Sequence, residues 1–249
     1  MAVDVLNVTK KFPVYEGMTQ NEQTRDGSFY ALSCVSLSIK EGECAVIAGA
    51  NGSGKSILMS IIAGLEEPSS GEVKTSEKVG LVFQEPDSQI LGETPREDIA
   101  FGPRNMKLSK KEINVRVDSA LDQTGLQQRA NFPARSLSGG EKRRLACAGV
   151  LAMDARIIIF DEPYANMDFP GVVQVNALFK KLIADGKTVV ILTHELEKCL
   201  ALSNRFIVLY KGMKVYDGDA DGALSCDLEA WGIHHPLKNP ARELGDLLW

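Results

Sequence analysis

The chain has 249 residues, enough for one large domain or for one domain with an appended lobe. Hydrophobic residues make up 44% and charged residues 24%, proportions that are ordinary for a globular protein and that exclude a disordered or fibrous chain. The net charge of −5 gives no bulk electrostatic reason to bind nucleic acid or an anionic membrane, so we expect no nucleic-acid partner.

Cysteine usage and apolar segments indicate where the protein works. The five cysteines are scattered and show no Cys-x-x-Cys spacing, which predicts buried reduced thiols rather than disulfides or a zinc site. No stretch approaches the roughly 18 consecutive apolar residues of a membrane span, and the N-terminus lacks a signal-peptide pattern. We therefore expect a cytoplasmic chain that reaches a membrane only by docking to other subunits.

The N-terminal part predicts an antiparallel layer followed by a buried parallel strand. Apolar residues at Val3, Val5 and Val8 predict a strand that ends near Phe12. The polar stretch 16–28 predicts a long surface loop, and residues 35–39 alternate as a half-buried strand does. Residues 44–48 are all apolar, which is typical of a strand that is covered on both faces.

A phosphate-binding loop follows that strand. It has the pattern Gly, four residues, Gly, Lys, Ser, placed between a predicted strand and a predicted helix, where the alternative is an ordinary glycine-rich turn. Lys55 is expected to reach the β- and γ-phosphates, and the Ser56 hydroxyl to ligate Mg²⁺. The residues expected to bind the nucleotide here are Gly49, Asn51, Gly52, Ser53, Gly54, Lys55, Ser56 and Ile57.

A helical insertion, about residues 95–152, separates this loop from the next buried strand, 157–160. Asp161 and Glu162 end that strand. In the company of a phosphate loop, Asp161 is expected to hold the magnesium shell, and Glu162 to orient or deprotonate an attacking water.

A second anion-binding turn lies inside the insertion. Ser138, Gly139 and Gly140 open a helix, with a hydroxyl and free backbone N–H groups. The basic residues 142–144 that follow are interpreted as a solvated helix face. Because one nucleotide does not need two such turns in one chain, we expect this one to serve a nucleotide on a second copy or a partner.

The C-terminal part alternates strands and helices again. Apolar residues of the tail, 220–249, predict one or two short helices that pack on their own domain or form a subunit interface. These apolar residues are Leu224, Leu228, Trp231, Ile233, Leu237, Leu244, Leu247 and Leu248.

Taken together, these motifs resemble the ATP-binding-cassette (ABC) ATPases. The phosphate loop, Gln84, the Ser-Gly-Gly turn, the strand ending in Asp161-Glu162, and Thr193-His194 occur in the family's order and spacing, over roughly residues 3–219. The resemblance implies an α/β fold, a P-loop cassette with a mixed or parallel core sheet, an antiparallel β layer and a helical subdomain. It implies ATP and Mg²⁺ as cofactors.

The same resemblance implies roles for further residues. Two cassettes sandwich two ATP molecules head to tail, so each site combines one chain's phosphate loop with the other's Ser-Gly-Gly turn. Gln84 contacts Mg²⁺ or the attacking water, and His194 contacts the γ-phosphate; with Lys55 and Glu162 these form the expected catalytic set. The expected metal ligands are Ser56, Gln84 and Asp161, and Asp168 joins the nucleotide-binding set.

Residues at positions that are less widely shared within the family narrow the resemblance to the ATPase subunits of energy-coupling-factor importers, the cobalt, nickel and vitamin uptake group. These positions lie in 79–89, 97–103 and 149–153. The group implies a second cassette (a copy or a paralogue), a transmembrane coupling subunit with helices docked near Gln84 and the helical insertion, and a small substrate-binding membrane protein. It places the chain at the cytoplasmic face of the membrane.

The chain departs from the family in three places. Ile57 stands where Thr is usual. Before Asp168, where the family usually has Thr, a small residue (Gly or Ala) and Leu, the chain has Tyr164, Ala165, Asn166 and Met167. The bulkier residues of this segment are expected to bear on communication between the two ATP sites. Adenine stacking needs an aromatic ring, and Phe12 aligns with the family's usual Tyr, with Tyr15 and Tyr30 as alternatives.

Two other functions compete with import. A soluble ABC machine acting on ribosomes or DNA usually has two cassettes in one chain or a long inserted coiled coil, and neither is visible here. A small-molecule kinase would leave the Ser-Gly-Gly turn and His194 unused. The transported substrate does not follow from the sequence.

Overall fold

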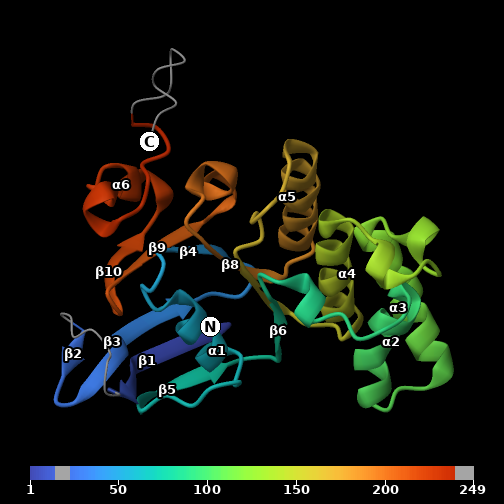
Figure 1. Ribbon diagram of the computed structural model, residues 1–249, viewed down its shortest axis with the longest axis horizontal. Helices are drawn as coiled ribbons and strands as arrows, with labels where there is room; N and C mark the ends of the chain where they lie inside the picture. Colours follow the sequence, from blue (N-terminus) through green and yellow to red (C-terminus); the bar gives the residue numbers. More distant parts are fainter. Residues whose placement is uncertain (15–22, 239–249) are drawn as a thin grey trace.

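Two β-sheets and a helical lobe make up the protein. The computed structural model describes residues 1–14 and 23–238 (Figure 1). The four-stranded antiparallel sheet has the order β2-β3-β1-β5, with bounds β1 Val3–Pro13, β2 Thr24–Arg25, β3 Ser28–Ile39 and β5 Ser70–Thr75. β3 extends further toward the N-terminus than expected, because its start pairs with β2 in a hairpin across part of the stretch predicted as loop.

The six-stranded sheet carries the nucleotide motifs. Its order is β10-β9-β4-β8-β7-β6, parallel except for the edge strand β10. Its bounds are β4 Cys44–Ala48, β6 Val79–Val82, β7 Ile157–Asp161, β8 Thr188–Thr193, β9 Arg205–Tyr210 and β10 Met213–Gly218. The carboxyl ends of parallel strands meet at one edge, where a sheet of this kind binds its ligands.

Helices cover the sheets and form the lobe at the right of Figure 1. Their bounds are α1 Lys55–Ile62, α2 Pro95–Asn105, α3 Lys110–Thr124, α4 Gly139–Ala152, α5 Phe169–Ala184 and α6 Ala220–Leu224. The mixed sheet, the antiparallel layer and the helical insertion are as predicted.

Three apolar cores hold the layers together. One lies between the two sheets and includes α1, a second lies on the other face of the six-stranded sheet under α5, and a third lies among α2, α3 and α4. Helix α4 belongs to two of them, because Ala146, Cys147 and Val150 face the sheet while Leu145 and Ala148 face the lobe. The lobe is therefore anchored to the sheet through α4.

The described part of the C-terminal tail packs on the chain's own domain. It forms the short helix α6 and a 3-10 turn, Leu228–Trp231, and it buries Ala223, Leu228 and Ile233 in the core under α5. The expected apolar positions Leu244, Leu247 and Leu248 lie outside the described residues. Over residues 1–14 and 23–238, no helix combines the length and the hydropathy needed to cross a bilayer.

Candidate functional site

The phosphate loop joins β4 to α1 at the carboxyl edge of the parallel sheet. Gly54 caps α1 with φ of 102°, and a Cβ built there would lie 2.6 Å from the Ala31 carbonyl oxygen. A Cβ on Gly49 would lie 2.4 Å from the Leu209 carbonyl oxygen. These two positions accept only glycine, which fixes the course of the loop and the direction of the first N–H groups of α1.

Lys55 is buried at the start of α1, with 6% of its surface exposed. Its Nζ donates to the carbonyl oxygens of Gly49 (2.6 Å) and Ala50 (3.3 Å) and lies 3.8 Å from Glu162 Oε1. Burial lowers the pKa of the ammonium, while the charges of Glu162 and Asp161 oppose that change. The loop thus holds a desolvated cation where a phosphate would bind.

Two carboxylates face this cation from the end of β7. Asp161 Oδ2 accepts a hydrogen bond from Ser56 Oγ at 3.3 Å, and burial, reinforced by the charge of Glu162, raises the pKa of Asp161. Glu162 has a left-handed backbone (φ 43°), held by its N–H, which donates to the Leu192 carbonyl oxygen at 2.8 Å. Such a backbone is costly for a residue with a side chain, and the surrounding contacts must hold it in place.

His194 follows β8 and completes this group. Its Nδ1 lies 3.0 Å from Glu162 Oε1, and about half of its side chain is exposed. Gln84, which follows β6, lines the same cavity as Glu162 and Lys55. Four neighbouring strands therefore bring Lys55, Ser56, Gln84, Asp161, Glu162 and His194 to one edge of the sheet.

This first cavity has a volume of about 320 Å³. It is lined by Phe12, Phe29, Ala31, Asn51, Gly52, Ser53, Gly54, Lys55, Ser56, Ile57, Gln84 and Glu162. Within the described ranges 1–14 and 23–238, three buried oxygens at or beside this cavity have no hydrogen-bond partner: Ser53 Oγ, Asp161 Oδ1 and Glu162 Oε2. Buried polar atoms are normally paired, so these oxygens and the buried ammonium fit a polar ligand with a hard cation.

Aromatic side chains lie at one side of the cavity. Phe12 on β1 pairs in register with Phe29 on β3, and both line the cavity. Tyr30 does not line it and lies under the Arg25 guanidinium, with 4.5 Å between the guanidinium carbon and the ring centroid. Tyr15 lies outside the described residues. Sequence reasoning missed Phe29, which only the β1–β3 register could have identified.

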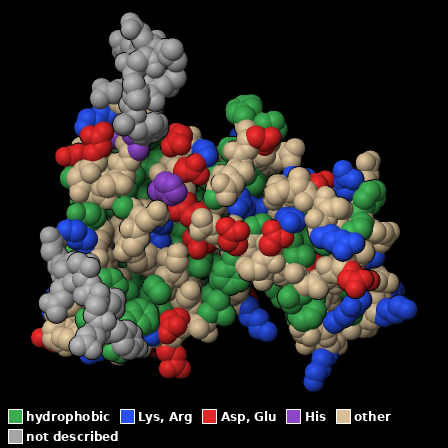
Figure 2. All heavy atoms as spheres, in the orientation of Figure 1, with side chains coloured by type: hydrophobic (Ala, Val, Ile, Leu, Met, Phe, Trp, Pro, Cys, Tyr) green, Lys and Arg blue, Asp and Glu red, His purple; other side chains and the backbone are tan. Residues whose placement is uncertain are grey.

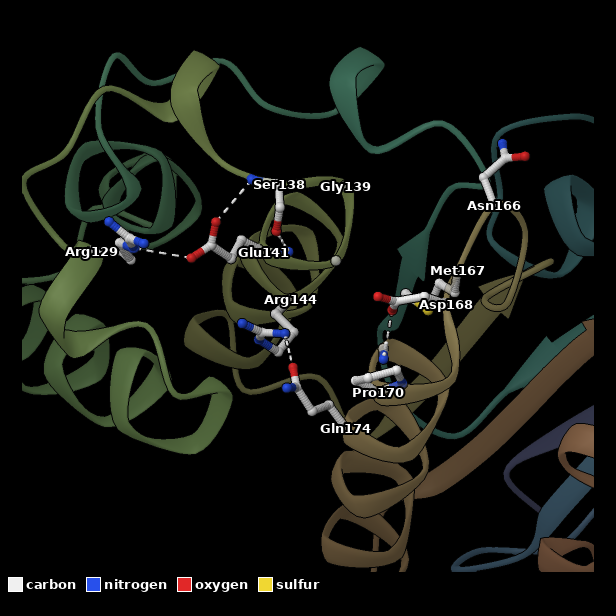
Figure 3. Close-up of a pocket in the computed structure, with 12 residues that line it drawn as sticks. Arg129, Ser138, Gly139, Glu141, Arg144, Asn166, Met167, Asp168, Pro170 and Gln174 are labelled. Carbon is white, nitrogen blue, oxygen red and sulfur yellow. Dashed lines mark hydrogen bonds and ion pairs between the residues drawn. The ribbon is translucent and has the colours of Figure 1, made fainter.

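The Ser-Gly-Gly turn lies in a second cavity of about 640 Å³, shown in Figure 3. Ser138 and Glu141 cap α4 reciprocally: Ser138 N donates to Glu141 Oε2 at 2.8 Å, and Glu141 N donates to Ser138 Oγ at 3.3 Å. Glu141 Oε1 also accepts from Arg129 Nε at 3.0 Å. Asp168 caps α5 across the cavity by accepting from Gly171 N at 3.0 Å.

The chain therefore has two separate half-sites. Among the residues that the structure describes, none lines both cavities, so Ser138, Gly139, Gly140 and Asp168 are not brought to the phosphate loop of the same chain. The second half-site is itself close to electrically balanced, because Arg129 and Arg144 face Glu141 and Asp168. Arg129 had no distinguishing signal in the sequence.

The basic stretch after the turn is not a solvated face throughout. Arg143 is only 6% exposed, and Lys142 pairs with Asp87 at 2.6 Å. Arg144 reaches Gln174 on α5 and fits the expectation better. The prediction is wrong for Arg143 because α4 packs between two cores, so every third or fourth residue on its sheet side is buried.

The departure at Tyr164 is accommodated inside the protein. The side chain is fully buried, and its hydroxyl donates to Asn176 Oδ1 at 2.7 Å. Asn166 and Met167, by contrast, line the second cavity. Of the unusual residues in this segment, the smaller ones thus face the half-site and the largest faces the core.

Comparison with known proteins gives consistent results. The model of the ABC transporter family matches residues 32–165. The energy-coupling factor transporter ATP-binding protein EcfA of Carboxydothermus hydrogenoformans is 39% identical over 251 residues, covering 95% of this chain and 88% of that protein. EcfA2 of Clostridium tetani is 41% identical over 208 residues, covering 76% of this chain and 72% of that protein.

Solved structures agree. The structure of cbiO1 from Clostridium perfringens, described as part of the ABC transporter complex cbiONQ, has a TM-score of 0.78 with 31% identity and 92% coverage of both chains. The ATP-binding cassette MJ0796, in a dimeric post-hydrolysis state bound to ADP and Pi, has a TM-score of 0.74 with 32% identity, covering 88% of this chain and 98% of that chain. The chain therefore belongs to the ABC transporter family, as an ATP-binding ATPase subunit of the energy-coupling-factor type.

Proposed function

We propose that ATP binds on the phosphate loop of this chain, and that its hydrolysis energises a membrane importer of metal ions or vitamins. The observation that carries the site assignment is the convergence of a desolvated Lys55 ammonium with three unpaired buried oxygens on Ser53, Asp161 and Glu162. The loop N–H groups and the start of α1 would hold the β- and γ-phosphates, with Lys55 moving from its loop carbonyls to the phosphates. Phe12 would stack on the adenine.

Ser56, Asp161 and Gln84 are the proposed Mg²⁺ ligands. Their oxygens are the hard donors that Mg²⁺ prefers, and the Ser56 hydroxyl already donates to Asp161 Oδ2 at 3.3 Å beside the cavity that Ser56 and Gln84 line. Bound there, Mg²⁺ would neutralise charge on the phosphates. Ionised Asp161 is the form that binds a cation, so its raised pKa makes metal binding favour higher pH.

Glu162 is the proposed acceptor for the attacking water. It lies at the entrance to the phosphate loop, and Lys55 at 3.8 Å and His194 at 3.0 Å restrict one of its oxygens, Oε1. The other oxygen, Oε2, is buried and has no hydrogen-bond partner among the described residues, which supports its proposed role as the acceptor for the attacking water once ATP is bound. His194 is half exposed and would contact the γ-phosphate.

A second cassette would complete each site. Ser138, Gly139, Gly140 and Asp168 would contact ATP held on the phosphate loop of the partner cassette, a copy or a paralogue. The support is that both half-sites are formed in this chain yet lie in different cavities. Glu141 N is capped by Ser138 Oγ, which leaves the N–H groups of Gly139 and Gly140, the first two of α4, for an anion.

Docking to a transmembrane coupling subunit would place the chain at the cytoplasmic face of the membrane, beside a small substrate-binding membrane protein. Large apolar side chains exposed around α2 support this: Leu91, Phe101 and Met106. Figure 2 shows Lys and Arg scattered over the helical lobe, with acidic side chains across the middle of the same face. We propose residues 1–219 as the cassette, with a helical subdomain at about 95–152 and 220–249 as its tail.

Affinity purification from detergent-solubilised membranes of the native cell tests this function. Recovery of a polytopic membrane protein together with a small membrane protein, and loss of both when Leu91 and Phe101 are replaced by Asp, supports the importer. Recovery of ribosomes or DNA-processing proteins without membrane proteins would contradict it. Leu65→Asp, at an exposed apolar residue away from α2, serves as the matched control.

A further inference from the structure

Arg143 is a buried cation that none of the proposed catalytic steps uses. Its guanidinium makes three hydrogen bonds to backbone carbonyl oxygens: Nη1 donates to Pro163 (2.8 Å) and Ala165 (3.0 Å), and Nη2 donates to Gln84 (2.8 Å). These carbonyls belong to two segments far apart in the sequence. One segment directly follows β6, and the other directly follows Glu162.

Burying the Arg143 charge costs free energy that docking of α4 alone would not require. Within residues 1–14 and 23–238, no ion pair includes Arg143, and its Nε is buried without a hydrogen-bond partner. Burial lowers the pKa of the guanidinium, while the charges of neighbouring groups, Glu85 and Glu195 among them, oppose that change. Buried charges are often no more stabilising than well-packed apolar side chains of similar volume. The hydrogen bonds of the guanidinium therefore point to a positional role for Arg143.

The three carbonyl groups identify the segments that the Arg143 guanidinium joins. Pro163 adjoins Glu162, whose left-handed backbone aims the carboxylate at the phosphate loop. Ala165 adjoins Asn166, which lines the second cavity. Gln84 lines the first cavity. One side chain on α4, the helix that begins at the Ser-Gly-Gly turn, thus joins the backbone of both half-sites.

We propose that Arg143 is a positioning residue for ATP hydrolysis, which ties the Gln84 turn to the segment after Glu162. A displacement of the Gln84 turn is transmitted through the guanidinium to the backbone that orients the Glu162 carboxylate. This rests on the proposed function, because it assigns Glu162 to the attacking water. The ion pair between Lys142 and Asp87 is a second link between α4 and the same turn, so Arg143 adds the link to Glu162 rather than the docking of α4 itself.

The geometry predicts which kinetic constant changes. Arg143 does not line the first cavity, and the phosphate loop is held by β4 and α1, so binding of ATP in the absence of Mg²⁺, which does not involve Gln84, is independent of Arg143. Misplacing a catalytic group by about 1 Å can cost roughly 100-fold in rate. Arg143→Met keeps an unbranched stem as far as the position of Nε and removes all three hydrogen bonds. Arg143→Lys keeps the charge but cannot span both segments, because an ammonium lacks the planar fork of a guanidinium.

The test is steady-state hydrolysis of Mg·ATP by the full-length chain, with ATP affinity measured separately by equilibrium binding in the absence of Mg²⁺. Arg143→Met is expected to lower kcat by at least about tenfold, and Arg143→Lys by a smaller factor, with the ATP dissociation constant within about twofold of the parent. Arg116→Met is the matched control. Arg116 also bonds a carbonyl, with Nη1 donating to Ala152 at 3.2 Å in the same lobe, and its loss should leave kcat unchanged.

Three results would overturn the proposal: parental kcat in Arg143→Lys and Arg143→Met, loss of ATP affinity in parallel with kcat, or an equal loss of kcat in Arg116→Met. If Arg143→Met does not fold, Arg143→Lys alone decides, and parental kcat in it refutes the tie. A parent chain that binds ATP but does not hydrolyse it would instead refute the proposed function. The two failures are therefore distinguishable.

Discussion

Tyr164 gives a quantitative test of the core beneath the hydrolytic segment. The side chain is fully buried, its hydroxyl donates to Asn176 Oδ1, and Asn176 Nδ2 donates to the Lys198 carbonyl oxygen at 2.7 Å. Its ring packs edge-on against Phe179, with the centroids 6.2 Å apart. Burial raises the pKa of the Tyr164 phenol, so the hydroxyl remains a donor across the accessible pH range.

Two substitutions separate the hydroxyl from the ring. Tyr164→Phe leaves Asn176 Oδ1 without this donor, at a cost of about 1.5 kcal/mol in the free energy of unfolding, which lowers Tm by roughly 3–6 °C. Tyr164→Thr, the residue usual in the family, also empties the space of a ring and should cost about 4 kcal/mol. Denaturant unfolding measures both.

A surface tyrosine supplies the control. The Tyr216 hydroxyl donates to the Asp219 carbonyl oxygen at 2.8 Å in an exposed setting, so Tyr216→Phe should cost less than about 1 kcal/mol. ATP affinity should be unchanged in all three variants. If Tyr164→Thr unfolded at the same denaturant concentration as the parent, Tyr164 would not be the packed core residue described here.

Three further predictions concern the half-sites and the thiols. Arg129→Gln leaves the Glu141 carboxylate uncompensated beside the second cavity, so ATP-driven dimerisation should weaken by roughly three- to tenfold. Light scattering in a Glu162→Gln background measures this dimerisation. Adding Glu141→Gln should restore the dimer, and a failure to restore it would contradict the charge argument. Phe12→Ala should raise the ATP dissociation constant about tenfold, whereas Tyr30→Ala should not; the reverse pattern would assign the adenine to Tyr30. A thiol reagent at pH 8 should modify the exposed Cys34 first. Burial raises the pKa of the Cys44 and Cys147 thiols to about 12 and that of the Cys199 thiol further still. Early labelling of any of these three buried thiols would contradict their burial.

The catalytic half-site could be predicted from the sequence because each part is a local pattern. The phosphate loop needs eight consecutive residues, and Asp161, Glu162 and His194 each directly follow an apolar strand. Parallel strands bring their carboxyl ends together whatever the details of packing, so the strand ends placed Asp161 and Glu162 beside the phosphate loop. His194 and Gln84 joined the predicted site only through the resemblance to the ABC ATPases.

Other contacts depend on packing that no local pattern encodes. Arg143 lies in a basic stretch whose pattern is typical of an exposed helix face. Its partners Pro163, Ala165 and Gln84 are 20, 22 and 59 residues away in the sequence. Phe29 reaches the cavity only through the β1–β3 register, which is interrupted by irregularities. The capping of Glu141 by Ser138 was implicit in the spacing, but its pairing with Arg129 required the fold of the lobe.

The most direct test of ATP hydrolysis by Glu162 in a two-cassette site is the Glu162→Gln variant of the full chain, assayed for ATP binding, ATP hydrolysis and oligomeric state. The amide keeps the shape of the side chain but cannot accept a proton from water. We expect the variant to keep parental ATP affinity and to lose nearly all turnover. Light scattering should show an ATP-dependent dimer, which persists because the variant cannot hydrolyse its nucleotide. Hydrolysis at the parental rate would contradict the role of Glu162, and an ATP-loaded monomer would contradict the two-cassette site.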